Sequence, residues 1–206
     1  MANHKLDTDQ QVFFYEQDFY VLSNFSSFTL QWKGIRFDTS EAAYHWEKFN
    51  YRPEGALDRL TVFGIQQSII KAPSAHEAFK TAAQYTEYRR PDWEDVRTGI
   101  MQDLLRAKAY QHEYVRRKLM ETGTRELIED SYRDSFWGWG EDGNGHNMLG
   151  KLWMIVREEV KSPDFHIHEF IAPGNDDAQQ CDADCRQNAH KCKTCSKTRS
   201  ELPAWV

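Results

Sequence analysis

A lysine near the middle of the chain stands where it could act as a nucleophile. Lys108 follows Val96, Ile100 and Leu104 at intervals of four residues, so a helix over 92–110 would aim its amino group along an apolar face. Burial lowers the pKa of an amine and lets it attack an aldehyde to form a Schiff base. The alternative is a lysine whose stem covers apolar surface and whose ammonium compensates the helix C-terminus, and the pattern favours neither.

A carboxylate, Glu41, stands at the expected start of another helix. It follows Asp38, Thr39 and Ser40. The spacing alone favours a structural role, in which Asp38 caps the helix and Glu41 closes a capping box at the third position. The functional alternative is a carboxylate that binds sugar hydroxyls or moves a proton.

The third candidate is a loop over residues 134–147 that contains four glycines and two tryptophans. Glycines let the backbone approach a ligand, tryptophans can stack on a base, and the loop leads into a helix N-terminus that favours anions such as phosphate. The loop lacks the Gly-Lys-Ser/Thr run of a P-loop, and no strong strand precedes it as in a dinucleotide fingerprint. A surface turn with two core tryptophans is the alternative.

The elements that must hold these residues are strands early in the chain and helices later. This order predicts an α+β fold: a mainly helical single domain with a small N-terminal antiparallel sheet. A strand is expected over 12–15 and a hairpin over 28–37, with Lys33-Gly34 as its turn. Helices are expected from Asp38 toward Pro53 and over 58–71, 74–84, 92–110, 115–120, 125–128 and 147–160.

Composition divides the 206 residues into a main domain over 1–162, a linker over 163–180 and a Cys-rich tail over 181–206. The net charge of −6 argues against non-specific nucleic-acid binding through a basic face, so a DNA or RNA substrate would need local contacts. The polar N-terminus carries no signal region, and no apolar run approaches the ~18 residues that span a bilayer. We therefore expect a cytoplasmic protein without membrane contact.

All four cysteines lie in the tail, so no disulfide framework holds the main domain. The spacing fits a structural Zn²⁺ held by four thiolates, and His190 could replace one of them. Free thiols or redox pairs are the alternatives. The tail is also locally basic, which suits contact with nucleic acid or another protein. The proposed zinc ligands are Cys181, Cys185, Cys192 and Cys195.

Five segments, taken in order, resemble the NADAR (YbiA-like) family over about residues 12–160. Three departures accompany the match: the family often has His where this chain has Ala42, Phe where it has Ala109, and a Gly-Arg pair where it has Ala-rich sequence around Ser74-Ala75-His76. The matching segments are 22–25, 39–49, 90–93, 107–112 and 134–150.

The resemblance implies an α+β, mainly helical domain that cleaves N-glycosidic bonds without a metal or other cofactor in catalysis. It implies two substrate classes, ADP-ribosylated guanine in DNA or RNA and phosphoribosylamino intermediates of riboflavin synthesis. Matched position by position, the implied catalytic residues are Glu41, Lys108 and Asp134. The implied substrate-binding residues are Asn24, Phe25, Trp93, Trp137 and Asn147. To these we add Gly143 and Gly145, because we expect loop amides near them to receive phosphate.

The leading hypothesis is removal of ADP-ribose from guanine through a Schiff base on Lys108, with Asp134 orienting the lysine or acting as partner acid. A direct oxocarbenium route with Glu41 and Asp134 is the competing mechanism. The acidic net charge favours the small metabolite as substrate, whereas the basic tail favours nucleic acid. A non-catalytic ADP-ribose or nucleotide binding module is the third hypothesis, and the oligomeric state stays open.

Overall fold

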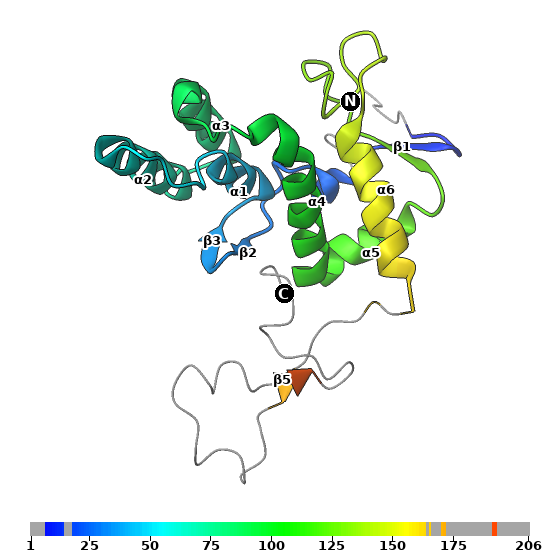
Figure 1. Cartoon of the computed structure of the whole chain (residues 1–206). Helices are drawn as coiled ribbons and strands as arrows, with labels where there is room; N and C mark the ends of the chain where they lie inside the picture. The colour runs from blue at the N-terminus through cyan, green and yellow to red at the C-terminus, as the bar shows by residue number, and fades with distance from the viewer. Residues whose placement is uncertain (1–6, 15–17, 164, 166–169, 172–190, 193–206) are drawn as a thin grey trace.

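The computed structural model describes residues 7–14, 18–163, 165, 170–171 and 191–192. The fold is mainly helical, and a central helix, α4, runs between two groups of helices (Figure 1). The helices are α1 (Ser40–Glu47), α2 (Ala56–Ile70), α3 (Ala75–Gln84), α4 (Trp93–Gln111), α5 (Glu113–Glu121) and α6 (Met148–Lys161), with short 3-10 turns at Tyr20–Leu22 and Thr86–Tyr88. The strands are β1 (Gln11–Phe13), β2 (Leu30–Trp32), β3 (Ile35–Phe37), β4 (Glu126–Ile128), β5 (Phe170–Ile171) and β6 (Lys191–Cys192).

The start of α1 corrects the expected cap. Thr39, and not Asp38, is the N-cap, because its extended backbone lets Oγ1 accept a hydrogen bond from the amide of Ala42 at 3.1 Å. The helix therefore begins one residue later than the capping-box frame requires. Glu41 closes no box, and its amide instead donates to the carbonyl of Asn24 at 3.1 Å.

The expected hairpin is confirmed. Strands β2 and β3 pair antiparallel across Lys33 and Gly34, which both have positive φ, as a two-residue hairpin turn requires. The buried carboxylate of Glu47 fastens this hairpin to α1, since it accepts from the indole of Trp32 and pairs with Lys33 at 2.8 Å.

The pairing of the first strand, β1, differs from expectation. Strand β1 pairs in parallel with β4, and Val12 lies opposite Leu127. Residues 125–128 were expected to be helical, but a short apolar run does not distinguish a helix from a strand, and the partner strand is far away in sequence. The N-terminal sheet is thus a parallel pair, separate from the antiparallel hairpin.

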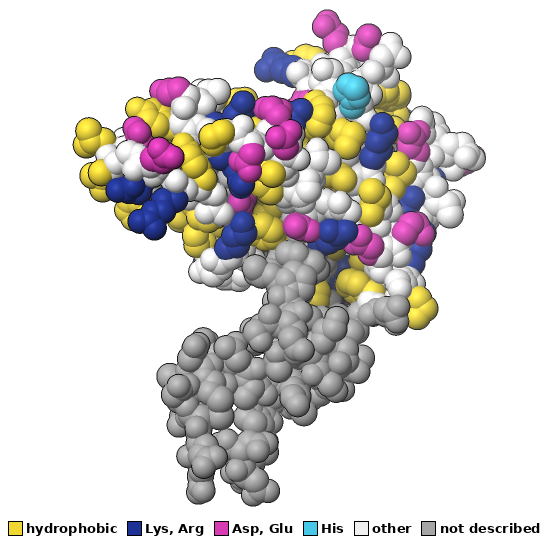
Figure 2. All heavy atoms as spheres, in the orientation of Figure 1, with side chains coloured by type: hydrophobic (Ala, Val, Ile, Leu, Met, Phe, Trp, Pro, Cys, Tyr) yellow, Lys and Arg dark blue, Asp and Glu magenta, His cyan; other side chains and the backbone are white. Residues whose placement is uncertain are grey.

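Helix α4 is the core element on which the others pack. It contacts α1 on one side and α6 on the other, and it also contacts α5 and β2. Helices α2 and α3 pack on α1 and project from the body (Figure 1). Hydrophobic side chains lie exposed on this projecting end (Figure 2), including Leu57, Leu60 and Phe63 of α2. No helix among the described residues is long and apolar enough to cross a bilayer.

The expectations for the C-terminal region fall largely outside the described residues. Cys181, Cys185 and Cys195 are not among them, and for Cys192 only the backbone pairing of β6 with β5 is described. The linker and the zinc site therefore stay predictions.

The contact between α6 and β4 yields a test of the fold. A Cβ on Gly150 would lie 2.0 Å from the carbonyl oxygen of Leu127, so Gly150→Ala must push α6 off β4. We expect a loss of about 1–3 kcal/mol in the free energy of unfolding, measured by urea titration. Gly99→Ala in α4 is the matched control, because nothing lies within 4 Å of its added Cβ. The control should be neutral or stabilising, and equal stability of the two variants would contradict the packing.

Candidate active site

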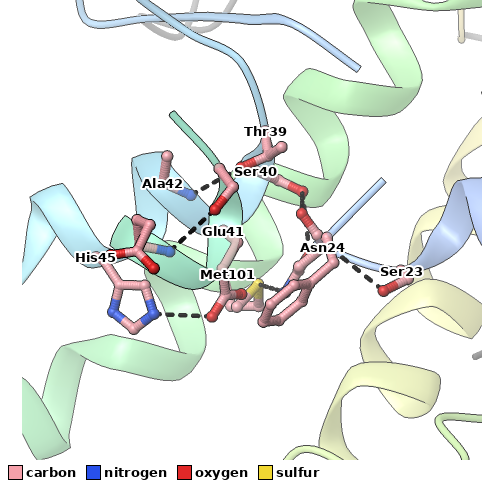
Figure 3. Close-up of polar contacts among 11 residues, drawn as sticks. Ser23, Asn24, Thr39, Ser40, Glu41, Ala42, His45 and Met101 are labelled. Carbon is pink, nitrogen blue, oxygen red and sulfur yellow. Dashed lines mark hydrogen bonds and ion pairs between the residues drawn. The ribbon is translucent and has the colours of Figure 1, made fainter. Parts of the chain in front are cut away.

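Glu41 is fixed at the start of α1 by a network that includes the segment before the hairpin (Figure 3). Its side chain is nearly buried, and Oε1 lies 2.8 Å from Nε2 of His45. Asn24 supports the backbone: its carbonyl accepts from the amide of Glu41, and its Oδ1 accepts from the hydroxyl of Ser40 at 3.1 Å. The Asn24 amide points back to the sulfur of Met101 at 3.2 Å. Asn24 therefore positions Glu41 from inside the protein.

Lys108 is completely buried, as one of the two sequence interpretations required. Its Nζ donates to the carbonyl of Ser23 at 2.8 Å and to the hydroxyl of Ser26 at 2.7 Å, and it lies 5.4 Å from the ring centroid of Phe28. Burial lowers the pKa of Lys108 to about 7, and the negative charge of Glu129 opposes this shift. The amine can thus lose its proton near neutral pH.

Glu129 is a functional candidate that the sequence analysis missed. It follows β4 and is almost fully buried. Burial raises its pKa to about 8, with repulsion from Glu41, Asp134 and Asp130 adding to the shift and Lys108 opposing it. Within the described part of the chain, Oε2 of Glu129 has no hydrogen-bond partner. Glu129 therefore holds a protonated carboxyl group, and this group interacts electrostatically with Glu41 and Lys108.

The sequence carried only a weak signal for Glu129. Neighbouring acidic residues such as Glu129 and Asp130 are typical of an exposed loop. The apolar pair Leu127 and Ile128 before them marks the end of a buried strand, but that signal becomes clear only once the pairing with β1 is known.

An aromatic cluster lies along α1 beside Glu41. The ring of Tyr44 is 5.0 Å from that of Trp93 and 5.5 Å from that of Trp137. Burial and the charge of Glu41 raise the pKa of Tyr44 above its ordinary range, so the phenol stays neutral. Trp93 is buried, whereas Trp137 is half-buried and keeps surface for a ligand.

Two cations border this cluster. Nζ of Lys48 lies 5.3 Å from the ring centroid of Tyr44, and burial lowers the Lys48 pKa to about 8. The guanidinium of Arg97 lies 3.7 Å from the ring centroid of Phe136. Both cations interact electrostatically with Tyr44 or Glu41, so they belong to the same site.

Asp134 organises the loop that carries Trp137. Its Oδ1 accepts from the amides of Phe136 at 2.9 Å and Trp137 at 2.8 Å. The described hydrogen bonds of Lys108 go to Ser23 and Ser26 instead, so the expected direct contact of Asp134 with Lys108 is not formed. Asp134 reaches the buried groups through its charge, which acts on Glu129.

The glycines of the loop shape it from within. The amide of Gly145 donates to the carbonyl of Trp139 at 2.6 Å, and that of Gly143 points to the carbonyl of Gly140 at 3.4 Å. A Cβ on Gly145 would lie 2.6 Å from the carbonyl oxygen of Gly138. These two amides are engaged inside the loop, so any phosphate there would have to use other loop amides nearby, and phosphate binding by the loop stays a prediction.

Asn147 and Phe25 are two further residues predicted to bind substrate, and they lie in different environments. Asn147, in the left-handed region, accepts from the amide of Glu129 and donates to the carbonyl of Leu127, so it ties the start of α6 to β4. Phe25 is 40% exposed and lines a cleft of about 440 Å³ with Tyr20, Thr39 and the first turn of α3. Of these two, only Phe25 offers surface to a ligand.

The site therefore combines a carboxylate, an amine able to be neutral, a protonated carboxyl group and an aromatic surface. Such a set can bind a flat group, move protons and add a nucleophile to a carbonyl. Among the described residues, no group of three or more His, Cys, Asp or Glu side chains is placed to hold a metal ion.

The part of the chain that contains this site is similar in sequence to known proteins. The family model described as the NADAR domain matches residues 13–161. A riboflavin biosynthesis protein of Vibrio vulnificus is 32% identical over 79% of this chain, which spans 42% of that protein. An N-glycosidase of Nostoc punctiforme is 33% identical over 73% of this chain and 93% of its own length.

The fold has a solved counterpart. The NMR structure of the Escherichia coli protein YbiA superposes with a TM-score of 0.64 at 28% identity, over 80% of this chain and 94% of that one. The sequence of the E. coli N-glycosidase YbiA is 31% identical over 69% of this chain and 82% of its own length. The predicted family and the predicted mainly helical, YbiA-like fold are thereby confirmed.

The burial of Lys108 predicts how it affects stability. Its pKa falls from about 10.5 in the unfolded chain to about 7 in the folded protein, so folding must remove a proton or bury a charge. This cost is complete below about pH 7 and vanishes as the pH rises to about 10.5, because only the unfolded chain then binds the proton. Lys108→Met removes this cost at neutral pH, and against that advantage stands a loss of about 1–3 kcal/mol from the carbonyl of Ser23, which no longer has its donor.

Urea titrations at several pH values measure this effect. The advantage of Lys108→Met should shrink as the pH rises toward about 10, because the wild type then no longer bears the cost. Lys71→Met, at an exposed lysine, is the control and should leave the pH dependence unchanged. An advantage that stays constant over this range contradicts the burial of a titrating amine.

Proposed function

This chain belongs to the NADAR family, and we propose on that premise that it hydrolyses the N-glycosidic bond between a ribose 5-phosphate group and a flat nitrogenous group. The observation that carries the proposal is the completely buried amine of Lys108, whose pKa is lowered to about 7, in the same set of charges as Glu129 and Glu41. The relatives named N-glycosidases support the class of reaction.

Each part of the proposed substrate has a matching surface. The half-buried ring of Trp137, backed by Tyr44, stacks on the flat leaving group. Lys48 and Arg97 supply positive charge for the phosphate, a role that the inward-facing glycine amides leave open. Glu41 binds the ribose hydroxyls and assists proton transfer.

In the Schiff-base route, the bond from C1 to the ring oxygen breaks, the glycosidic N–H passes its proton through Glu41 to that oxygen, and a double bond forms between C1 and the nitrogen. The neutral amine of Lys108 then adds to C1, and one of its protons moves to that nitrogen. The carboxyl group of Glu129 gives its proton to the departing nitrogen, the bond from C1 to that nitrogen breaks, and an imine joins C1 to Lys108. Water then adds to the imine, releases the sugar aldehyde and restores the amine. Because Nζ of Lys108 is covered and bonded to Ser23 and Ser26, this route requires those bonds to open.

In the direct route, the sugar departs as an oxocarbenium ion and water attacks C1. Glu41 stabilises the positive charge and receives the proton of the water, and Glu129 protonates the leaving group. Glu129 here takes the acid role expected of Asp134, whose oxygen Oδ1 is engaged with two loop amides. Lys108 then acts through its charge and its hold on the backbone of Ser23.

Two substrates fit the proposal. The first is ADP-ribosylated guanine in DNA or RNA, which the basic tail favours. The second is a phosphoribosylamino intermediate of riboflavin synthesis, favoured by the net charge of −6 and by the name of the Vibrio relative. Both carry a ribose phosphate on a flat nitrogenous group, so one site serves either.

An assay with three compounds tests the function and separates these substrates. ADP-ribosylated guanosine, a phosphoribosylamino-pyrimidine and free NAD are incubated with the full chain, and the released base is measured by chromatography. We expect release from one of the first two, and a loss of about 100-fold or more in Glu41→Gln. Near-normal turnover by Glu41→Gln would return that residue to a structural role, and no release from any compound would exclude the hydrolase.

Trapping distinguishes the two routes. Borohydride added during turnover reduces an imine to a stable amine, so the Schiff-base route predicts a sugar adduct on Lys108 by mass spectrometry. Lys108→Met should give no adduct and no turnover. Turnover of the wild type without any adduct supports the direct route instead.

A further inference from the structure

We propose that His45 is the positioning residue of Glu41: it donates the proton of Nε2 to Oε1 and leaves Oε2 facing the substrate. The inference deepens the function proposed for Glu41. It stands on a contact of its own, since the two residues are one helical turn apart on α1 and their side chains meet at 2.8 Å (Figure 3).

The orientation of the His45 imidazole is restricted by its neighbours. His45 is 2% exposed, and its ring contacts those of Tyr44, 5.6 Å away, and Phe79 of α3, 5.5 Å away. Close packing of these rings limits rotation of the side chain. The direction of the Nε2–H bond is therefore fixed toward Glu41.

The protonation state follows from the same surroundings. Burial lowers the pKa of His45, with Lys48 adding to this shift and Glu41 opposing it, so the ring is neutral near pH 7. A neutral imidazole has one N–H, and a carboxylate can only accept. Nε2 must carry the proton, and Nδ1, which has no partner among the described residues, is the bare nitrogen.

This arrangement divides the two oxygens of Glu41 between different tasks. Oε1 is satisfied by His45, whereas the described contacts give Oε2 no protein partner. The carboxylate keeps 11% of its side chain exposed and acts electrostatically on Tyr44 and Lys48, which border the aromatic surface. Oε2 is thus the oxygen left for a ribose hydroxyl or a proton. In the sequence, a histidine one helical turn after the glutamate gives no sign of this contact.

Two amide variants separate the hydrogen bond from the packing. In His45→Gln the side-chain nitrogen is as many bonds from Cα as Nε2 is, so it can still donate to Oε1. In His45→Asn the nitrogen is only as far out as Nδ1, the atom that has no partner in the structure. Both variants lose the ring contacts with Tyr44 and Phe79, so their melting temperatures should fall by similar amounts.

The measurement is kcat and KM of each variant on whichever substrate the wild type hydrolyses. We expect His45→Asn to lose about 10- to 100-fold in kcat/KM, as for a lost hydrogen bond to a charged group, and His45→Gln to recover most of it. Activities are compared at temperatures where both variants are fully folded. Equal loss in both variants, or no loss in His45→Asn, overturns the proposal.

A second measurement does not depend on turnover. Nitrogen NMR of the histidine rings in the full chain should show His45 as the neutral tautomer with the proton on Nε2. A proton on Nδ1, or a charged ring at neutral pH, overturns the dyad. Absence of hydrolysis together with the expected tautomer would instead count against the proposed function and leave the Glu41–His45 contact established.

Discussion

The structure depends most on the backbone of the segment 22–26, which three helices hold by hydrogen bonds. The indole of Trp153 in α6 donates to the carbonyl of Leu22 at 2.7 Å, and Lys108 of α4 donates to that of Ser23. The amide of Glu41 in α1 donates to the carbonyl of Asn24. Buried carbonyls need such partners, since an unpaired one costs about 1–3 kcal/mol. This irregular segment can be buried only because each helix supplies one donor, and the helices are in turn aligned by it.

The structural role of Lys108 and the catalytic role proposed for it make opposite demands on its proton. As a donor to Ser23 and Ser26 it belongs to the framework, yet its burial lowers the cost of losing the proton that makes it a good donor. Burial has the opposite effect on Glu129, because it disfavours the charged carboxylate. Glu129 therefore holds a proton that an exposed carboxyl group would release. The pair keeps ionisable groups where apolar residues would be more stable, a pattern typical of sites selected for chemistry.

Much of the helical framework could be predicted because its information is local. The apolar periodicity gave α2, α3, α4 and α6 to within a few residues, and the same periodicity placed Lys108 on a buried face. The hairpin followed from Lys33-Gly34, whose left-handed turn needs no distant partner. The resemblance to the NADAR family added what periodicity cannot, namely the prediction that Glu41 and Lys108 belong to one site.

What could not be predicted depends on contacts between distant segments. Glu129 is a functional candidate because it is buried directly after β4, and β4 forms by pairing with β1. The hydrogen bonds of Asp134 and Gly145 could not be predicted for the same reason, since only the folded loop shows that Oδ1 of Asp134 and the amide of Gly145 are engaged within it. His45 was overlooked because a histidine on a helix is unremarkable until its ring is seen against Glu41.

The parallel pairing of β1 with β4 also has a consequence for biosynthesis. Gln11 and Glu126 are paired although 115 positions separate them, so β1 leaves the ribosome long before its partner. Helices α1 to α4 can collapse meanwhile through contacts nearer in sequence, whereas the edge beside Glu129 closes only after β4 emerges. Until then the apolar side chains of β1 have no cover from that strand.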